Sequence, residues 1–151
     1  MLDIKKGTST DIKDCIESLY ASVLTTSYFL SEDYTREWVL EGLERNEIFM
    51  AQKDGSVIGF MRIDFQGAFA KFPLLRVIAI KDNHRNRGLG REMLKYFEDI
   101  SFKDYDKVFL LVSEFNSNAK RLYSRLNYLE VGCIPGLYKK EYSEFLMMKT
   151  R

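Results

Sequence analysis

The residues with the clearest potential for chemistry lie in the stretch HRNRGLGREM, residues 84–93. Arg85 and Arg87 precede Gly88 and Gly90, just where an apolar pattern of helical period begins. A helix N-terminus is partially positive, so each cation placed there costs roughly 0.3–1 kcal/mol. Glycines let a backbone approach a ligand closely and adopt positive φ. The stretch therefore predicts an anion site in which backbone amides and arginines bind together.

Composition limits the class of protein. The 151 residues, 46% hydrophobic and 30% charged, are typical of a soluble globular chain with one substantial core. No apolar run is long enough to span a bilayer, and the first residues lack the apolar core of a signal peptide. The net charge of +1 gives no overall field that attracts nucleic acid or an anionic membrane. We therefore expect a single cytoplasmic domain over residues 1–151, with neither of these two partners.

The two cysteines, Cys15 and Cys133, form no disulfide framework and no metal-ligand spacing. Free cysteine packs as a small apolar group, so we expect both to be reduced thiols in the core. No metal site is expected.

Periodicity and turn signals predict a mixed α/β sheet. The segment 73–112 reads as strand, helix and strand, which makes its two strands parallel neighbours with a right-handed crossover. Asp54-Gly55 indicates a hairpin, and the flanking hairpins are expected to be antiparallel. The expected strands are 2–6, two within 47–65, 73–80, 107–113, 128–134 and 144–150. The expected helices cover about 12–24, 35–45, 88–101 and a last one capped by Asn116 and Ser117.

The glycine stretch follows the central strand that ends at Ile80, where open α/β sheets bind ligands. A P-loop needs Lys and Ser or Thr after its second glycine, but Arg91 and Glu92 follow Gly90. The dinucleotide fingerprint needs a third glycine, and Met93 stands in its place. The stretch therefore matches neither of these phosphate-binding motifs.

A third pattern fits. Arg85-x-x-Gly88-x-Gly90 resembles the acyl-CoA signature of the GCN5-related N-acetyltransferase (GNAT) superfamily, whose loop wraps the CoA pyrophosphate. The segment 116–128 resembles a second family signature, with Asn116 and Tyr123 in their expected places and Ala119 between them. Asn127 and Tyr128 replace the usual Gly and Phe. The first replacement is mild, because Asn is the next best residue at a left-handed helix end.

The resemblance covers essentially the whole chain and implies a single-domain GNAT fold. This is a mixed, mostly antiparallel sheet with a splayed central parallel strand pair and flanking helices. It implies direct transfer of an acetyl group from the cosubstrate acetyl-CoA to a primary amine, of a small molecule or a peptide N-terminus. A homodimer is possible, as in many relatives. The residues that it assigns to acetyl-CoA are Ile78, Ala79, Ile80, Arg85, Asn86, Arg87, Gly88, Leu89, Gly90, Asn116, Ala119 and Tyr123.

Two rival hypotheses stay open at this point. A CoA-binding sensor without turnover would keep the same donor residues and lack catalysis. A nucleic-acid-binding protein using 84–91 would bind in a strongly salt-dependent way, and the small net charge disfavours it.

By resemblance, Tyr123 is the general acid that protonates the leaving thiolate, and an amide near Ile80 polarises the thioester oxygen. Some relatives carry a glutamate base early in the central strand, but this chain has Leu74-Leu75-Arg76 there. Glu114 is the nearest alternative in sequence, with Asp64 and ordered water as further candidates.

The acceptor site of the family is formed by the first two helices, the 24–34 loop and the last hairpin. These segments are aromatic here, and Tyr28, Tyr34 and Tyr138 are candidates for holding a cationic amine. Packing within the loops would also account for them. Arg76 interrupts an apolar strand, and we expect an internal salt bridge or a side chain that extends to solvent, with contact to a substrate carboxylate as the alternative.

Overall fold

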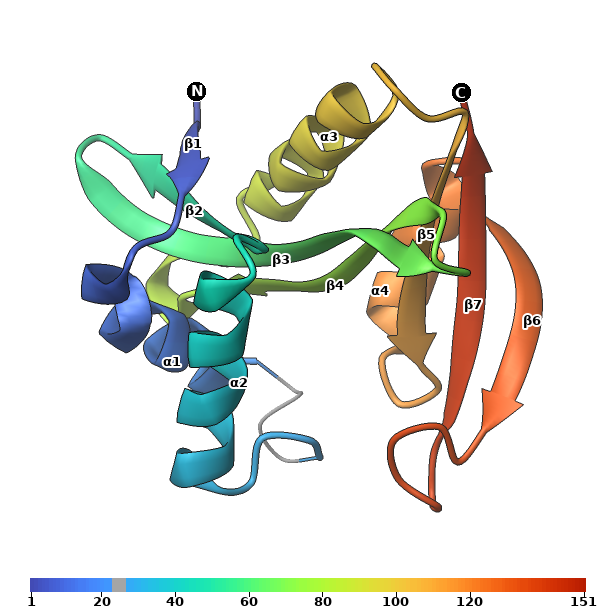
Figure 1. Ribbon diagram of the computed structural model, residues 1–151, viewed down its shortest axis with the longest axis horizontal. Helices are drawn as coiled ribbons and strands as arrows, with labels where there is room; N and C mark the ends of the chain where they lie inside the picture. Colours follow the sequence, from blue (N-terminus) through green and yellow to red (C-terminus); the bar gives the residue numbers. More distant parts are fainter. Residues whose placement is uncertain (23–26) are drawn as a thin grey trace. The chain divides into compact units, whose positions relative to one another are not determined.

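The computed structural model describes residues 1–22 and 27–151 (Figure 1). The chain divides into two compact units, the first formed by Met1–Ile63 with Val77–Phe97 and the second by Asp64–Arg76 with Glu98–Arg151. The expectation of one domain over 1–151 therefore stays a prediction. None of the helices in the described ranges is long and apolar enough to cross a membrane.

The seven strands form one mixed sheet with the order β1-β2-β3-β4-β5-β7-β6, and β4 with β5 is its parallel pair. This confirms the predicted fold class. The strands are β1 Asp3–Lys6, β2 Ile48–Lys53, β3 Ser56–Ala68, β4 Phe72–Ile80, β5 Lys107–Ser113, β6 Leu129–Pro135 and β7 Ser143–Thr150. The helices are α1 Ile12–Tyr20, α2 Glu32–Glu44, α3 Leu89–Ser101 and α4 Ser117–Arg125.

The parallel pair is short. Leu74 lies opposite Phe109 and Leu75 opposite Leu110, whereas β4 continues to Ile80 and β5 to Ser113. In the described part of the chain these are the register pairs of β4 with β5. The splay of the two strands beyond them stays a prediction.

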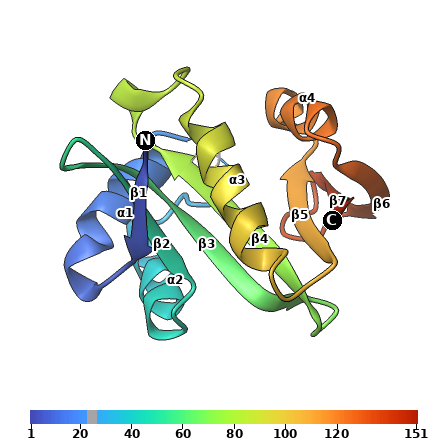
Figure 2. The same ribbon diagram turned by 90° about the horizontal axis from the view of Figure 1, so that it is seen from above.

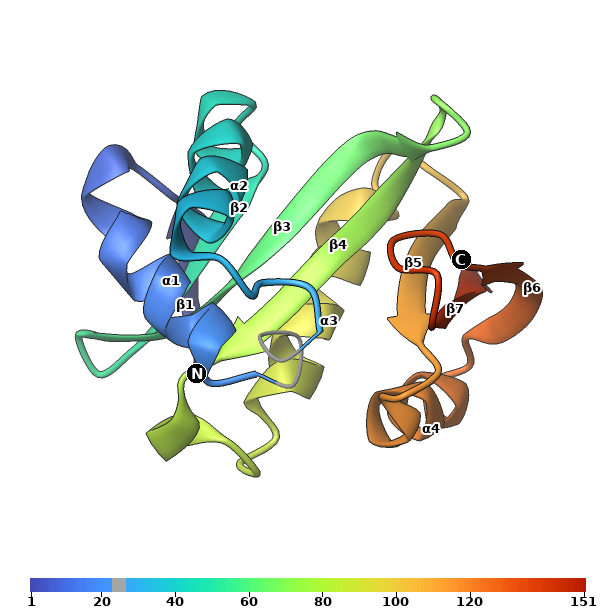
Figure 3. The ribbon, with the colours of Figure 1, turned by 90° about the horizontal axis from the view of Figure 1, so that it is seen from below.

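In the first unit, helices cover both faces of the sheet. Figures 2 and 3 show α1 and α2 on one face of β3 and β4, with α3 on the other. The buried core on the α1 and α2 side joins aliphatic, aromatic and sulfur side chains of both helices, of β2, β3 and β4, and of the segment before α2. Its members are Cys15, Leu19, Phe29, Val39, Ile48, Met50, Phe60, Val77 and Ala79.

The helix ends follow local capping chemistry. Thr8 N–H donates to Asp11 Oδ2 at 2.8 Å, as the TSTD pattern predicts. The second helix begins at Glu32, earlier than the predicted 35, because Ser31 caps it by accepting from Tyr34 N–H at 3.3 Å. The first helix ends at Tyr20, and the remaining predicted turn falls partly on residues 23–26, outside the described residues.

The prediction for the cysteines is confirmed at one position and wrong at the other. Cys15 is buried and its thiol donates to Met50 Sδ at 3.6 Å. Burial raises the pKa of the Cys15 thiol to about 12, with Asp11 and Asp14 adding to the effect, so it stays protonated. Cys133 is exposed because it lies on β6, which is an edge strand of the sheet and has no fully buried side chain.

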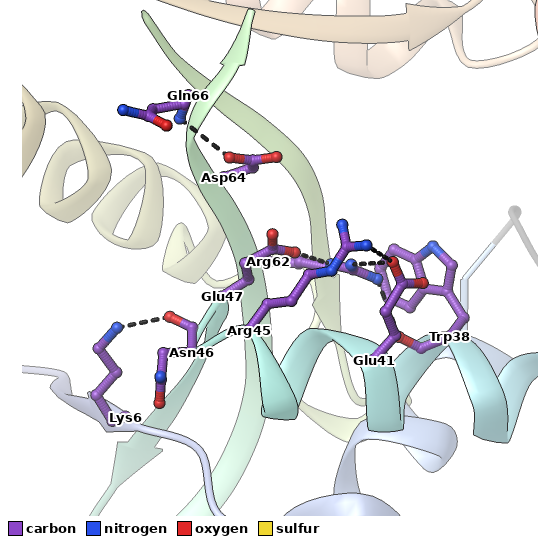
Figure 4. Close-up of polar contacts among 9 residues, drawn as sticks. All are labelled: Lys6, Trp38, Glu41, Arg45, Asn46, Glu47, Arg62, Asp64 and Gln66. Atoms are coloured by element: carbon purple, nitrogen blue, oxygen red, sulfur yellow. Dashed lines mark hydrogen bonds and ion pairs between the residues drawn. The ribbon is translucent and has the colours of Figure 1, made fainter. Parts of the chain in front are cut away.

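A buried arginine joins α2 to β2 and β3 (Figure 4). Arg62 is fully buried, and its Nε donates to Glu47 Oε2 at 2.6 Å. Its Nη1 donates to the Trp38 carbonyl at 2.9 Å, and the guanidinium lies 4.4 Å from the Trp38 ring centre. Glu41 Oε1 is 3.7 Å from Nη2. The sequence patterns missed this cluster, because the partner of a charged residue inside an apolar strand depends on tertiary packing.

We expect Arg62→Ala to lower the free energy of unfolding by about 3–5 kcal/mol, because Glu47 would keep a buried and uncompensated charge. The exposed pair of Arg45 with Glu41, 3.0 Å apart, provides the matched control. Arg45→Ala should cost about 0–1 kcal/mol. Urea unfolding followed by circular dichroism measures both, and equal losses would contradict the buried role of Arg62.

Candidate active site

The glycine turn lies in the first unit, between β4 and α3. A short 3-10 helix, Asp82–His84, leads into it, and Asn86 and Gly88 adopt positive φ angles of 61° and 75°. The prediction that glycine supplies a left-handed conformation is confirmed at Gly88. Asn86 takes the same conformation because asparagine tolerates it better than most residues. The helix then begins at Leu89, close to the predicted 88.

The backbone of this turn presents unused donors. Among the described residues, no acceptor is found for the N–H groups of residues 86–91. Helical pairing begins only at Glu92, whose N–H donates to the Gly88 carbonyl at 3.3 Å. Unpaired amides at a helix N-terminus form a ready site for an anion. The backbone arrangement that an anion site requires is therefore present, and the binding of an anion there stays a prediction.

The two arginines of the turn differ in how they are held. Arg85 Nε donates to the Ile80 carbonyl at 3.4 Å and lies 3.9 Å from Asp82 Oδ1. Arg87 is exposed, and within the described chain it has no ion-pair partner. Arg85 is thus oriented by the end of β4, while Arg87 is available to a ligand.

The end of β4 is held tightly in the first unit. A Cβ on Gly59 would lie 2.2 Å from the Ala79 carbonyl oxygen, so only glycine permits this close approach of strands. Lys81 Nζ pairs with Asp14 Oδ1 at 2.5 Å and with Glu17 Oε2 at 3.2 Å. Burial alone would lower the pKa of Lys81, but the hydrogen bonds to these carboxylates raise it. Sequence reasoning missed these contacts, which position the segment Ile78–Ile80.

In the second unit, Asn116 stands at the N-cap of α4. Its backbone N–H donates to the Ser113 carbonyl at 2.9 Å, but its side chain makes no capping hydrogen bond. The predicted capping role of the Asn116 side chain is therefore wrong. Because no interaction of this half-buried amide is found within the described residues, the amide is free to bind a ligand.

Tyr123 lies on the half-buried face of α4. Its ring centre is 5.9 Å from that of Tyr128. Burial raises the pKa of Tyr123 to about 12, so the phenol remains protonated across the physiological range. A protonated, partly enclosed phenol has the properties required of a general acid. The helix ends in Asn127 at a φ of 70°, which confirms the expected left-handed residue.

A polar triad next to Tyr123 links the segment between α4 and β6 to α3 and β7. Tyr128 Oη donates to Glu98 Oε1 at 3.0 Å, and Lys149 Nζ donates to Glu98 Oε2 at 2.9 Å. Burial raises the pKa of Tyr128, and the negative charge of Glu98 raises it further. The hydroxyl that replaces the family's usual Phe is thus used internally. Sequence reasoning missed the triad because Glu98 and Lys149 are 51 residues apart.

The raised pKa values of Tyr123 and Tyr128 predict that the stability of the fold decreases at alkaline pH. Their folded-state pKa values lie above the ordinary 10.0, so the folded chain retains protons that the unfolded chain loses. The stabilisation is complete below about pH 10 and is lost as the pH rises further. We expect the free energy of unfolding to decrease less steeply above pH 10 in Tyr128→Phe than in the unmodified protein. Urea titrations at several pH values measure the slopes, and identical slopes would contradict the prediction.

The predicted base candidates have structural partners. Glu114 is exposed, and its Oε1 accepts from Ser143 N–H at 2.8 Å, while its own N–H donates to the Ser143 carbonyl at 3.0 Å. Asp64 Oδ1 accepts from Gln66 N–H at 3.0 Å (Figure 4). Both carboxylates therefore hold local backbone, and the role of either as a base stays a prediction.

The acceptor candidates differ in exposure. Tyr34 and Tyr138 are about half exposed, at 51% and 52%, whereas Tyr28 packs partly buried against the core of the first unit. Arg76 is exposed, and the expected internal salt bridge is absent from the described part of the chain. Residues 24–26 of the predicted 24–34 acceptor loop lie outside the described residues. No cluster of metal-ligating side chains occurs in the described ranges.

Comparison with known proteins decides the family. The model of the acetyltransferase (GNAT) family matches residues 14–128. The chain belongs to this family. The match includes both signatures, the glycine turn and the segment from Asn116 to Tyr128.

The chain is also similar to individual proteins that are named as acetyltransferases. An N-alpha-acetyltransferase of Sulfurisphaera tokodaii is 27% identical over 131 residues, 78% of each chain. A mycothiol acetyltransferase of Thermobispora bispora is 29% identical over 105 residues, 60% of this chain and 36% of the relative. The chain thus matches about a third of that longer protein. The solved structure of yncA from Salmonella typhimurium with its cofactor acetyl-CoA has a TM-score of 0.72 at 15% identity, covering 99% and 94% of the two chains.

Proposed function

We propose that this GNAT acetyltransferase transfers an acetyl group from acetyl-CoA directly to the primary amine of a small molecule or of a peptide N-terminus. The observation that carries the proposal is the row of unpaired amides at residues 86–91, at the place of the family's CoA signature. The N-alpha-acetyltransferase of Sulfurisphaera tokodaii supports a peptide N-terminus as the acceptor, and the mycothiol acetyltransferase of Thermobispora bispora supports a small molecule.

The residues of the chain fit the donor substrate. In the proposal, the amides of the glycine turn and the side chains of Arg85 and Arg87 bind the pyrophosphate. The backbone of Ile78–Ile80 pairs with the pantetheine arm as an added strand would. The unused side-chain amide of Asn116 supplies a further hydrogen bond. The donor brings an activated thioester, and the protein supplies its orientation.

The proposed chemistry needs two proton movements. The acceptor ammonium loses a proton before its nitrogen attacks the thioester carbon, and the departing thiolate receives one. Tyr123 is the proposed donor of the second proton, because its hydroxyl stays protonated with a pKa of about 12. An amide near Ile80 is the proposed donor to the thioester oxygen.

A thiol-release assay tests the proposal. The protein with acetyl-CoA is offered amino acids, polyamines, aminoglycosides and short peptides with free N-termini. At least one primary amine should release CoA thiol at a rate well above the rate without protein. Binding of acetyl-CoA by calorimetry without thiol release from any amine would instead favour a CoA-binding sensor.

A further inference from the structure

A buried carboxylate and a hydroxyl lie together at the C-terminal end of β5. Ser113 Oγ is 2.8 Å from each of the two carboxylate oxygens of Glu144 and donates to them. The two residues are directly opposite in the register of β5 and β7, and both are buried, Glu144 at 2% exposure. A glutamate is rarely so buried, because removing its charge from water is costly. Ser113 is three residues before Asn116, the residue proposed to bind the acyl donor.

The register places this pair on a defined face of the strands. Cross-strand partners point to the same face, and successive residues alternate between faces. Val112 lies opposite Phe145, so these two occupy the face opposite to Ser113 and Glu144. Lys120 of α4 lies 3.5 Å from the Phe145 ring centre, so α4 covers the Phe145 face.

Tyr123 belongs to the face covered by α4. Its ring packs against Tyr128, which contacts Lys149 of β7 with 5.6 Å between ammonium and ring centre. Lys149 shares its face with Phe145, since they are four residues apart on one strand. Glu144 and Tyr123 are therefore on opposite faces of the β5–β7 pair, within one unit of the fold.

Direct acetyl transfer uses such an arrangement. In the tetrahedral intermediate the nitrogen and the sulfur are separate substituents of one carbon, so the base at the nitrogen and the acid at the sulfur must be two groups held apart. We propose that Glu144 is the general base that accepts the proton of the acceptor ammonium. The inference rests on the proposed function and adds to it the residue on the acceptor side. Ser113 is the positioning residue, because its hydroxyl orients the carboxylate.

The step balances in atoms and protons. One proton moves from the ammonium nitrogen to a Glu144 oxygen, and the nitrogen lone pair forms the C–N bond. The C–S bond breaks, and its electron pair leaves on the sulfur. A second proton leaves the nitrogen for solvent as the amide forms. Tyr123 gives its proton to the thiolate and regains one from solvent, and Glu144 releases its proton to solvent, so the whole reaction yields one free proton.

Other titratable groups of this unit surround the end of β7. Glu114 is anchored to Ser143 N–H, and the ring of Tyr142 packs on Phe115 at 4.9 Å. The turn between β6 and β7 also carries Lys139, Lys140 and Glu141. Their charges are the same in a Glu144→Gln variant, so a difference in pH profile between that variant and the unmodified protein isolates Glu144.

Glu144→Gln is the decisive variant, because the amide keeps the shape and an oxygen that accepts from Ser113. With the amine of highest rate in the panel, we expect kcat to fall about 100-fold or more. The acidic limb of the kcat/KM profile should move to higher pH, because the variant can use only the amine that is already neutral in solution. The Kd for acetyl-CoA, measured by calorimetry, and the Tm should remain close to those of the unmodified protein.

Two comparisons separate a base from a structural residue. The loss in Glu144→Gln should shrink for a fluorinated, weakly basic analogue of the same amine, which is already neutral at the assay pH. Ser113→Ala should retain the carboxylate and move the acidic limb to higher pH. Glu130→Gln is the matched control. Glu130 lies on β6, is exposed and pairs with Lys120 of α4, so its replacement should keep kcat and the pH profile.

The possible failures are distinguishable. An active protein whose Glu144→Gln variant keeps kcat within about twofold and the same pH profile would overturn this inference alone. The same would follow if the loss appeared in Glu114→Gln instead. Absence of thiol release by the unmodified protein with every amine would overturn the proposed function, and the inference with it. If Glu144→Gln does not fold, the shift in Ser113→Ala decides, and an unmoved limb overturns the inference.

Discussion

Tyr123→Phe is expected to lower kcat for amine acetylation by about 100- to 1,000-fold and to leave the Kd for acetyl-CoA nearly unchanged. The hydroxyl is the proposed proton donor to the thiolate, and burial keeps it protonated by raising its pKa to about 12. Phenylalanine retains the ring contact with Tyr128, so the helix should stay in place. Steady-state thiol release gives kcat, and calorimetry gives the Kd.

Two other tyrosines separate acid catalysis from packing. Tyr20 is 41% exposed at the end of α1, and Tyr20→Phe should not change kcat. Tyr128→Phe removes the hydrogen bond to Glu98 without touching the Tyr123 hydroxyl, so its loss should appear in stability rather than in kcat. A Tyr123→Phe variant with kcat within about threefold of the unmodified protein would show that another group protonates the thiolate.

The second large effect concerns the glycine turn, where Arg85→Ala combined with Gly88→Ala should weaken acetyl-CoA binding about 100-fold or more. At a φ of 75°, alanine is strained by roughly 1–2 kcal/mol, and the turn relieves that strain by rotating its amides away. Removing a charged hydrogen bond from Arg85 costs roughly 1.5–3 kcal/mol more. At about 1.4 kcal/mol per tenfold change, the sum gives this estimate.

Gly55 offers a matched control for the backbone strain. It has a φ of 80°, and a Cβ there would meet nothing within 4 Å, as at Gly88. Gly55→Ala should therefore cost similar stability and leave the Kd for acetyl-CoA unchanged. Calorimetric titration of the control and of the double variant makes the comparison. An unchanged Kd in the double variant would refute the phosphate-binding role of the turn.

Much of the fold follows from local patterns. The residues Asp54 and Gly55 lie between β2 and β3 with positive φ, as a two-residue hairpin turn requires. The strand β5 has the predicted bounds 107–113, because a continuous apolar run between turn signals leaves little choice. Gly88 and Asn127 adopt the left-handed conformations expected from their types and places.

The polar partners could not be predicted, because they depend on strand register and helix docking. The bond from Ser113 to Glu144 joins residues 31 apart, and it forms only because β7 pairs with β5 in one register. Arg62 of β3 and Glu47, which precedes β2, are similarly 15 residues apart and come together only in the folded chain. Sequence reasoning therefore named Glu114 as a candidate base from its distance along the chain, whereas Glu144 could be proposed only once the register was known.

The most direct measurement is the fate of an isotope-labelled acetyl group. The protein is mixed with acetyl-CoA labelled in the acetyl carbons and with the amine that releases most thiol, and the products are analysed by mass spectrometry. We predict that the label appears on the amine nitrogen in an amount equal to the thiol released. Labelled free acetate with an unmodified amine, or no release of label from bound acetyl-CoA, would contradict N-acetyl transfer.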